Sequence, residues 1–397
     1  MTRRLLSDWS IWCKTRMSAL NEDAPNRDDA FGQLRRELQE LLQQTHAAGI
    51  PELEADRRDL MRFVGFGVSS LESHAQRRRS APGAALDALE AGEFIQLLGD
   101  SLGHVPRDSL YTYCLWNTGD GRIAFTRDQQ EDLFVDVVAV SLAHIEAAIR
   151  TIDLALMAHS LSVLPDVAEL LNKSASELSS ARLQFSRFRG SLTKEFFLGE
   201  LRQYNVPWVI GGREWHAPTA ADSAAQIELD LLCGFRSDEY MEHVNSRAEY
   251  LTRADREQVE LMIGNDARSL TEMIRATIAT VPDVRPFANP YVLRDAIQKL
   301  TPERQEVVRA AHGVLLEAGK LTARHFQLVD NYLESEPEAP QRGPVASAKG
   351  TSGMSVEQLA ELVEMRRFDP MARTLNGAMM LLSGRATEVR GIGRSLS

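Results

Sequence analysis

A histidine at position 325 lies on the apolar stripe of a helical pattern that runs from Thr301 to Tyr332. Thr301 is a good N-cap residue and Pro302 suits the first helical position, so the helix should begin there. The apolar residues recur at the spacing of a core-facing helix: Val307, Val308, Ala311, Val314, Leu315, Ala318, Leu321, Leu328, Val329 and Tyr332. From this pattern alone, His325 can be a satisfied core residue, a metal ligand or a catalytic base.

The chemistry of metal binding limits what one histidine can hold. A zinc ion needs three or four ligands, which a lone histidine on a helix cannot provide. Haem iron needs only one from the protein, because the porphyrin supplies four nitrogens. Cys13, Cys114 and Cys233 are far apart and form no C-x-x-C pair. They therefore predict no cysteine-based metal site and fit a reduced cytoplasm.

A long loop rich in proline and glycine follows this helix. It begins at Ser335 and contains a pair of hydroxyl residues, Thr351 and Ser352. Gly350 and Gly353 flank the pair. Loops of this length inside a compact domain are usually functional or disordered. The backbone N–H groups and hydroxyls here could hold a carboxylate, an ammonium or a propionate group.

The signatures of several common enzyme classes are missing from the sequence. There is no G-x-x-x-x-G-K-[ST], H-E-x-x-H, G-x-S-x-G or dinucleotide-binding fingerprint. The formal net charge of −11 argues against non-specific nucleic-acid binding, which requires a basic surface. No stretch of about 20 residues is apolar and uncharged, and the N-terminus is a poor secretory signal. We therefore expect a cytoplasmic protein without a membrane span.

The helix and the loop resemble a known family. Arg324–Val329, Tyr332 and Ala348–Gly353 are similar to the proximal haem-ligand helix and the substrate loop of the indoleamine and tryptophan dioxygenase superfamily. The similarity is closer to the branch that contains monodechloroaminopyrrolnitrin synthase, and it covers about residues 100–385. This branch belongs to antibiotic biosynthesis.

The resemblance implies haem b as the cofactor, with His325 as the ligand of its iron. Further contacts to the cofactor are implied for Arg324, Gly350 and Gly353. Contacts to an aromatic amino-acid substrate are implied for Thr351 and Ser352.

Two earlier stretches match the distal side of the haem pocket in this superfamily. Tyr111 and Cys114 have the spacing of a tyrosine and a cysteine that line this pocket in the indoleamine dioxygenases. From the residues alone, the same stretch is also typical of a core helix with an aromatic stripe. Ser141 matches a serine that lies over the haem, which implies a catalytic role. His144, one turn later, is a rival haem ligand on its chemistry alone.

A third stretch, residues 194–212, resembles the same branch and implies that Phe196 and Phe197 hold the indole ring. In the indoleamine dioxygenases an arginine here holds the substrate carboxylate, but this position is Glu195 in the present chain. Lys194 is the nearest cation, on a different face of the helix. The partner of the substrate carboxylate therefore stays open.

A fourth match concerns Asp230. It corresponds to an acidic residue that pairs with an arginine three residues before the haem ligand, which implies a contact on the cofactor side. That arginine position is Thr322 in this chain. Lys320 or Arg324 could take its place.

Helical patterns account for nearly the whole chain. Besides the helix at 301–332, they predict helices over residues 28–48, 55–72, 129–156 and 183–204. No stretch shows the sustained alternation of a strand, so the fold should be all-α. The resemblance implies the helical haem-binding domain of the indoleamine dioxygenases. We place it at residues 106–383, after a small N-terminal helical region at 1–105 and before a mobile tail at 384–397.

These residues, together with the resemblance, predict an enzyme that uses haem and dioxygen or peroxide. Its substrate would be tryptophan or a substituted tryptophan in specialised metabolism. The reaction would be a rearrangement, an oxygenation or a decarboxylation. Ring cleavage of the 2,3-dioxygenase type is the alternative reaction, and a haem-binding sensor or carrier is the non-enzymatic alternative.

Overall fold

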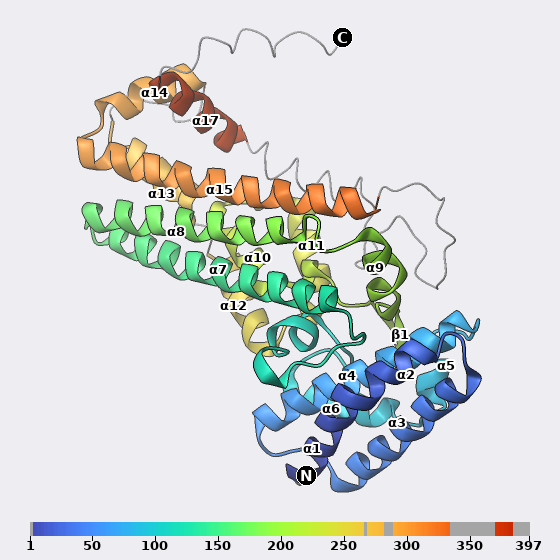
Figure 1. The fold of residues 1–397 in the computed structure, drawn as a ribbon. Coiled ribbons are helices and arrows are strands. Elements are labelled where there is room, and N and C mark those ends of the chain that lie inside the picture. The colour runs from blue at the N-terminus through green and yellow to red at the C-terminus, as the bar shows by residue number, and fades with distance from the viewer. Residues whose placement is uncertain (1–2, 266–267, 282–288, 334–369, 384–397) are drawn as a thin grey trace.

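The structure, a computed structural model, describes residues 3–265, 268–281, 289–333 and 370–383. Within these residues it consists of helices, loops and one antiparallel hairpin of β1 (Trp208–Ile210) and β2 (Arg213–Trp215) (Figure 1). The predicted all-α class is confirmed. The predicted tail from residue 384 lies outside the described residues.

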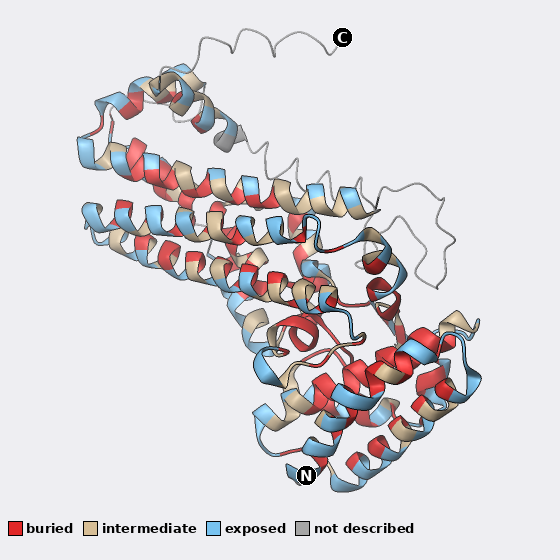
Figure 2. Ribbon diagram, viewed as in Figure 1, coloured by how far each residue is buried: buried red, intermediate tan, exposed pale blue. Residues whose placement is uncertain are grey.

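Helix α4 (Glu54–Arg77) is the centre of the N-terminal helices. All of its residues from Leu60 to Ala75 are buried (Figure 2). Gly67 allows close packing on one side, because a Cβ there would lie 2.8 Å from the Leu38 side chain. Around α4 lie α1 (Arg3–Trp12), η1 (Cys13–Met17), α2 (Ser18–Asp23), α3 (Asp28–Ala48), α5 (Ala84–Asp87) and α6 (Gly92–Leu102).

Three long helices lie side by side in the other half of the molecule, with α8 (Leu164–Gln184) between α7 (Gln129–Ser160) and α15 (Pro302–Leu333) (Figure 1). The Thr151 and Ser174 hydroxyls are 2.6 Å apart between α7 and α8. Arg182 Nε donates to Glu317 Oε2 at 3.3 Å between α8 and α15. Helix α15 begins at Pro302 as predicted, and the predicted stripe is buried from Val307 to Leu321.

Shorter elements connect and cover these two sets of helices. They are η2 (Tyr111–Leu115), η3 (Gly119–Gly121), η4 (Phe185–Phe188), α9 (Lys194–Gly199), η5 (Leu201–Tyr204), η6 (Ala220–Asp222), α10 (Ala224–Cys233), α11 (Asp238–Arg247), η7 (Ala248–Tyr250), α12 (Arg253–Ile263), α13 (Leu270–Ile278), α14 (Pro290–Lys299) and α17 (Pro370–Leu382).

The single helix predicted over residues 183–204 is wrong. Helix α8 ends at Gln184, and η4, a loop, α9 and η5 follow it. Two local features break the helix. Gly190 has φ +76°, in the left-handed region, and Thr193 caps α9 by accepting a hydrogen bond from Phe196 N at 3.3 Å. The aromatic spacing alone did not reveal this turn.

The N-terminal helices are joined to the rest of the molecule through buried polar contacts. Ser73 Oγ on α4 donates to Gln203 O at 2.6 Å. Asn21 Nδ2 on α2 donates to Phe125 O at 2.9 Å. The division of the chain near residue 105 stays a proposal, and these contacts mark the surface at which the two regions would meet.

Replacing Gly234 with alanine should destabilise the fold strongly. Gly234 follows α10 with φ +93°, and a Cβ there would lie 2.1 Å from Thr271 Oγ1. We expect the free energy of unfolding to fall by more than about 2 kcal/mol, because the clash adds to a left-handed backbone cost of about 1–2 kcal/mol. The control is Gly119→Ala, with φ +65° and nothing within 4 Å of an added Cβ. Equal losses in urea unfolding would contradict this account.

The buried His74 should make stability depend on pH. Burial and the nearby charges of Arg77 and Arg78 lower the pKa of His74 to about 3, from 6.5. The unfolded chain therefore binds the proton more readily, and stability present above pH 6.5 is lost as the pH falls toward 3. Relative to a His74→Gln variant, the wild type should lose about 2 kcal/mol of unfolding free energy between pH 7 and pH 5. Urea unfolding at both pH values checks this; a constant difference would refute it.

Candidate functional site

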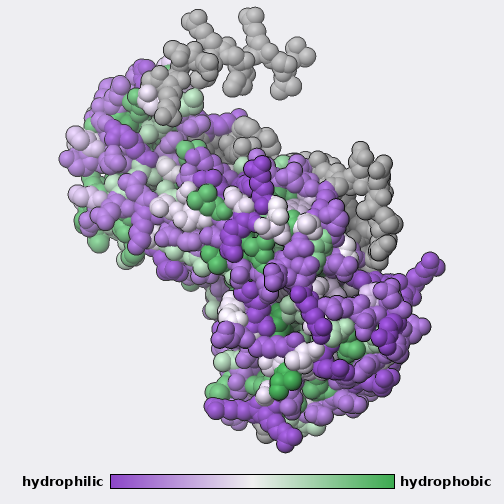
Figure 3. Space-filling view, viewed as in Figure 1, coloured by the Kyte–Doolittle hydropathy of each residue, from purple (hydrophilic) through white to green (hydrophobic). Residues whose placement is uncertain are grey.

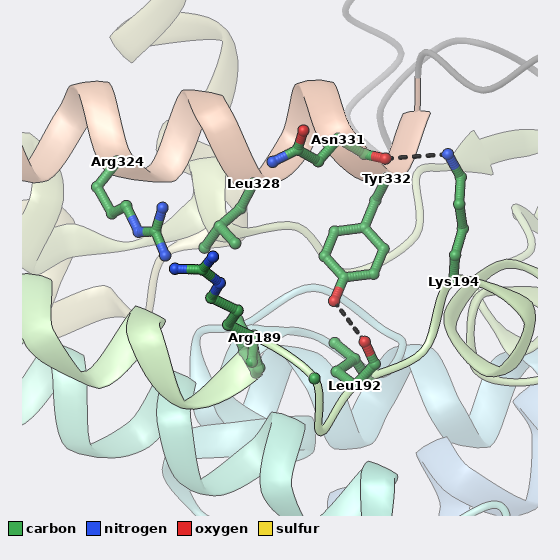
Figure 4. A pocket seen from close by; sticks show the side chains of 9 residues that line it. Arg189, Leu192, Lys194, Arg324, Leu328, Asn331 and Tyr332 are labelled. Atoms are coloured by element: carbon green, nitrogen blue, oxygen red, sulfur yellow. Dashed lines mark hydrogen bonds between the residues drawn. The ribbon is translucent and has the colours of Figure 1, made fainter.

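A cavity of about 470 Å³ lies where the last turns of α15 face the loop between η4 and α9 (Figure 4). Pockets of this size suit small organic ligands. The residues that line it are Phe188, Arg189, Gly190, Leu192, Lys194, Arg324, Leu328, Asn331 and Tyr332. The cavity thus combines aromatic and aliphatic walls with three cationic side chains.

Hydrogen bonds hold the two sides of this cavity together. Tyr332 Oη on α15 donates to Leu192 O at 2.7 Å, and Lys194 Nζ donates to Asn331 O at 2.9 Å (Figure 4). Thr193 N donates to the side-chain oxygen of Gln130, on α7, at 2.6 Å. The loop is therefore tied to both α7 and α15.

The charge of the cavity is positive. Among the described residues that line it, Arg189, Lys194 and Arg324 are cationic and none is acidic. The guanidinium groups of Arg189 and Arg324 point toward one another (Figure 4). Arg324 Nη1 lies 3.5 Å from the neutral Gln327 side chain. The arrangement can bind an anionic group beside an apolar one.

His325 follows Arg324 on α15 and is partly buried. Its ring centroid lies 5.9 Å from that of Phe185. A chain of neighbouring rings continues from Phe185 through Phe188, Phe134 and Phe197 to Tyr332, with centroids 5.0–6.4 Å apart. His325 and Phe197 therefore both contact this aromatic cluster, and Arg324 lines the cavity beside it. Phe196 is buried in α9 next to Phe197.

Tyr111 and Cys114 lie in the core, in the π-helical turn η2. Tyr111 Oη donates to Asp255 Oδ2 at 2.5 Å, and burial beside this carboxylate raises the pKa of Tyr111. Burial also raises the pKa of the Cys114 thiol. Neither residue lines the cavity, but Tyr113 between them lies 6.2 Å from Phe134, ring to ring, and so touches the same aromatic cluster.

Ser141 and His144 face α8 rather than the cavity. Ser141 is buried on α7, and its Oγ donates to Ala181 O at 3.4 Å. His144 Nδ1 lies 2.7 Å from Glu177 Oε2. Both side chains therefore contribute to the packing of α7 on α8.

Asp230 accepts hydrogen bonds within its own part of the fold. Tyr240 Oη donates to it at 2.8 Å and Gln226 Nε2 at 3.1 Å. Of its suggested partners on α15, Lys320 pairs with Glu317 at 2.7 Å. The residues Gly350, Thr351, Ser352 and Gly353 of the predicted loop site lie outside the described residues.

The family model described as monodechloroaminopyrrolnitrin synthase PrnB matches residues 19–280. The chain belongs to this family. The PrnB family is a family of enzymes that modify tryptophan in antibiotic biosynthesis. No curated protein matches the chain. The PrnB match contains η4, the loop and α9, and it ends before α15, so His325 and Arg324 lie beyond the matched residues.

Arg189 is a charged lining residue of this cavity that the sequence did not single out. Several arginines occur near it, at positions 182, 187 and 202, and no spacing separates Arg189 from them. The turn at Gly190, with φ +76°, follows it directly. This turn leads the chain back beneath α15, so the glycine after Arg189 was the only local signal.

The described part of this PrnB-family chain offers no conventional multi-ligand metal site. Within it, no three His, Cys, Asp or Glu side chains are grouped so that they could hold a metal ion. Its three cysteines are buried and form no disulfide. None of the described helices combines the length and apolar character needed to cross a bilayer. The molecular face shown in Figure 3 is mainly hydrophilic.

Proposed function

We propose that this protein is a haem-dependent enzyme that oxidatively transforms tryptophan or a substituted tryptophan. The reaction would be a rearrangement, an oxygenation or a decarboxylation. Membership of the PrnB family supports a tryptophan-derived substrate. The observation that supports haem as the cofactor is the imidazole of His325, which lies on α15 beside an aromatic and cationic cavity.

The side chains near His325 fit the needs of haem. One imidazole is enough for the iron, because the porphyrin supplies the other nitrogens. Phe185 and Phe188 offer flat apolar surfaces, and Arg324 offers a charge for a propionate. His325 would therefore hold the iron and Arg324 the rim of the cofactor. Haem bound there would supply the activation of dioxygen or peroxide.

The protein's own residues would bind and orient the substrate. Phe197 and Tyr332, with ring centroids 5.0 Å apart, provide faces against which an indole can pack. In the described part of the lining, no side chain is a carboxylate that could act as a general base. Their contribution would be to place the ring and to exclude water, and the hydrogen bond from Tyr332 to Leu192 would keep this wall in place.

The roles suggested for other residues remain predictions. The resemblance alone suggests a catalytic role for Ser141. It alone also suggests substrate contacts for Tyr111, Cys114 and Phe196. These side chains are buried and do not line the described cavity. The same holds for Asp230 as a contact on the cofactor side.

An absorption spectrum of the purified protein, titrated with tryptophan and followed by product mass, tests the proposal. We expect a Soret band that shifts with tryptophan, and a product that has gained one oxygen or lost carbon dioxide. A product with two added oxygens would indicate ring cleavage instead. Haem bound without turnover of any indole would favour a sensor or carrier. A protein that binds no haem would refute the enzyme proposal.

A further inference from the structure

We propose that Arg189, together with Arg324 and Lys194, forms a carboxylate-binding site in the cavity between α15 and α9. This inference rests on the proposed function, because the carboxylate would belong to the amino-acid substrate or to a haem propionate. Arg189 would thereby take the place of the arginine that is absent at position 195, where the chain has Glu195.

The three cations reach the cavity from three places in the chain. Arg189 lies in the loop after η4, Lys194 is the first residue of α9, and Arg324 lies on α15. Figure 4 shows the guanidinium groups of Arg189 and Arg324 pointing toward one another. Their convergence comes from the tertiary fold, since 135 positions separate these two arginines (324 minus 189).

No acid neutralises these cations among the residues that the structure describes. Lys194 donates to the backbone oxygen of Asn331 at 2.9 Å, and Arg324 lies 3.5 Å from the Gln327 amide. Arg182, on the neighbouring helix α8, does pair with an acid, Glu317 on α15, at 3.3 Å. Like charges gathered in a cavity repel one another, and a bound anion would remove this cost.

A carboxylate is the anion that the cavity suits best. Guanidinium groups bind planar carboxylates through two parallel hydrogen bonds. Phe188, Leu192, Leu328 and Tyr332 form the apolar part of the described lining. A ligand with an aromatic body and one carboxylate, of the size of an aromatic amino acid, matches both parts within about 470 Å³.

The loop that carries Arg189 is held in place by hydrogen bonds within the protein. Leu192 N donates to Phe188 O at 3.0 Å, and Leu192 O accepts from Tyr332 Oη at 2.7 Å. Binding therefore need not order the backbone of this loop, which favours affinity. Only the exposed Arg189 side chain would lose freedom.

The test compares Arg189→Gln with Arg187→Gln, a matched control two residues away. Arg187 is exposed and donates to Gln184 Oε1 at 3.2 Å, outside the cavity lining. Binding of tryptophan and of tryptamine, which lacks the carboxylate, is measured by calorimetry. Binding of haem and of haem dimethyl ester, whose propionates are masked, is measured by absorbance. Circular dichroism establishes that each variant is folded.

We expect Arg189→Gln to weaken tryptophan binding by about ten- to hundredfold and to leave tryptamine binding unchanged. Arg189→Lys should restore part of the loss, and Arg187→Gln should match the wild type. If Arg189→Gln instead binds haem more weakly but binds haem dimethyl ester and tryptophan as the wild type does, the carboxylate at this site is a haem propionate. The inference is overturned if Arg189→Gln changes the binding of tryptophan and of tryptamine equally, and the binding of haem and of haem dimethyl ester equally. Haem-dependent turnover in the wild type would still stand in that case, so the two proposals can fail separately.

Discussion

A His325→Ala variant is expected to lose the Soret band and all measurable turnover of tryptophan. No other histidine side chain on α15 lies beside the aromatic cluster, whereas His325 lies 5.9 Å from Phe185, ring to ring. Loss of an outer-shell partner alone typically costs a metal site 10–100-fold in affinity, so loss of the ligand itself should cost more than about a hundredfold. Haem titration of the purified apoprotein measures the change directly.

The same helix provides a control for this experiment. His312 lies on α15, and its Nε2 is 3.3 Å from Asn376 Oδ1 on α17, away from the cavity. His312→Ala should keep haem binding and turnover at the wild-type level. If His325→Ala bound haem as tightly as His312→Ala does, His325 would not be the ligand, and His144 would be the next histidine to replace.

An Arg107→Ala variant is expected to lose about 3–5 kcal/mol of unfolding free energy, the cost typical of breaking a buried ion pair. Arg107 is fully buried and pairs with Asp108 at 2.6 Å. It also donates to Trp215 O at 2.7 Å and to Val206 O at 3.2 Å, and its guanidinium lies 4.9 Å from the Trp208 ring. The substitution would leave a buried carboxylate and two carbonyl oxygens without their donor. Urea unfolding gives the value.

Arg150→Ala is the control for this loss. Arg150 is 67% exposed and faces Glu146 one turn away on α7, at 3.8 Å. Exposed pairs of this kind contribute about 0.5 kcal/mol or less. A loss below about 1 kcal/mol for Arg107→Ala would show that water replaces the guanidinium in its pocket.

Helix α15 could be predicted because its signals are local. Thr301 and Pro302 mark its first turn, and the apolar spacing continues to Leu321 without interruption. The helix begins at Pro302 and buries that stripe. A cap and a periodic stripe depend on neighbouring residues alone, so the sequence contained enough information for this element.

The cavity could not be predicted, because it depends on contacts between distant residues. Arg189 reaches Arg324 only through the turn at Gly190 and the packing of α8 against α15. The apolar pattern predicted one continuous helix across residues 183–204, so the loop within this range was not expected. Near position 195, the sequence therefore indicated Lys194 as the nearest cation for a substrate carboxylate.

Similarity between short stretches indicated which other residues to consider, but it did not predict their neighbours in space. Ser141 lies on α7 as the pattern predicted, but its hydroxyl meets the carbonyl of Ala181. Tyr111 meets Asp255, which is 144 positions away. Which neighbour a side chain meets is decided by how whole helices pack, and no short stretch records that packing.

Helix α15 packs along α8, yet it lies outside the residues that match the family. The part of the chain that must fold together is therefore longer than the part that matches the family. The family match ends at residue 280, more than twenty residues before α15 begins at Pro302. A fragment cut at the end of the match would retain α8 without the helix that covers it, and Arg182 would lose Glu317. The uncovered apolar side of α8 would then favour aggregation. The smallest fragment that can be expected to fold on its own therefore extends through α15, well past the end of the recognisable similarity.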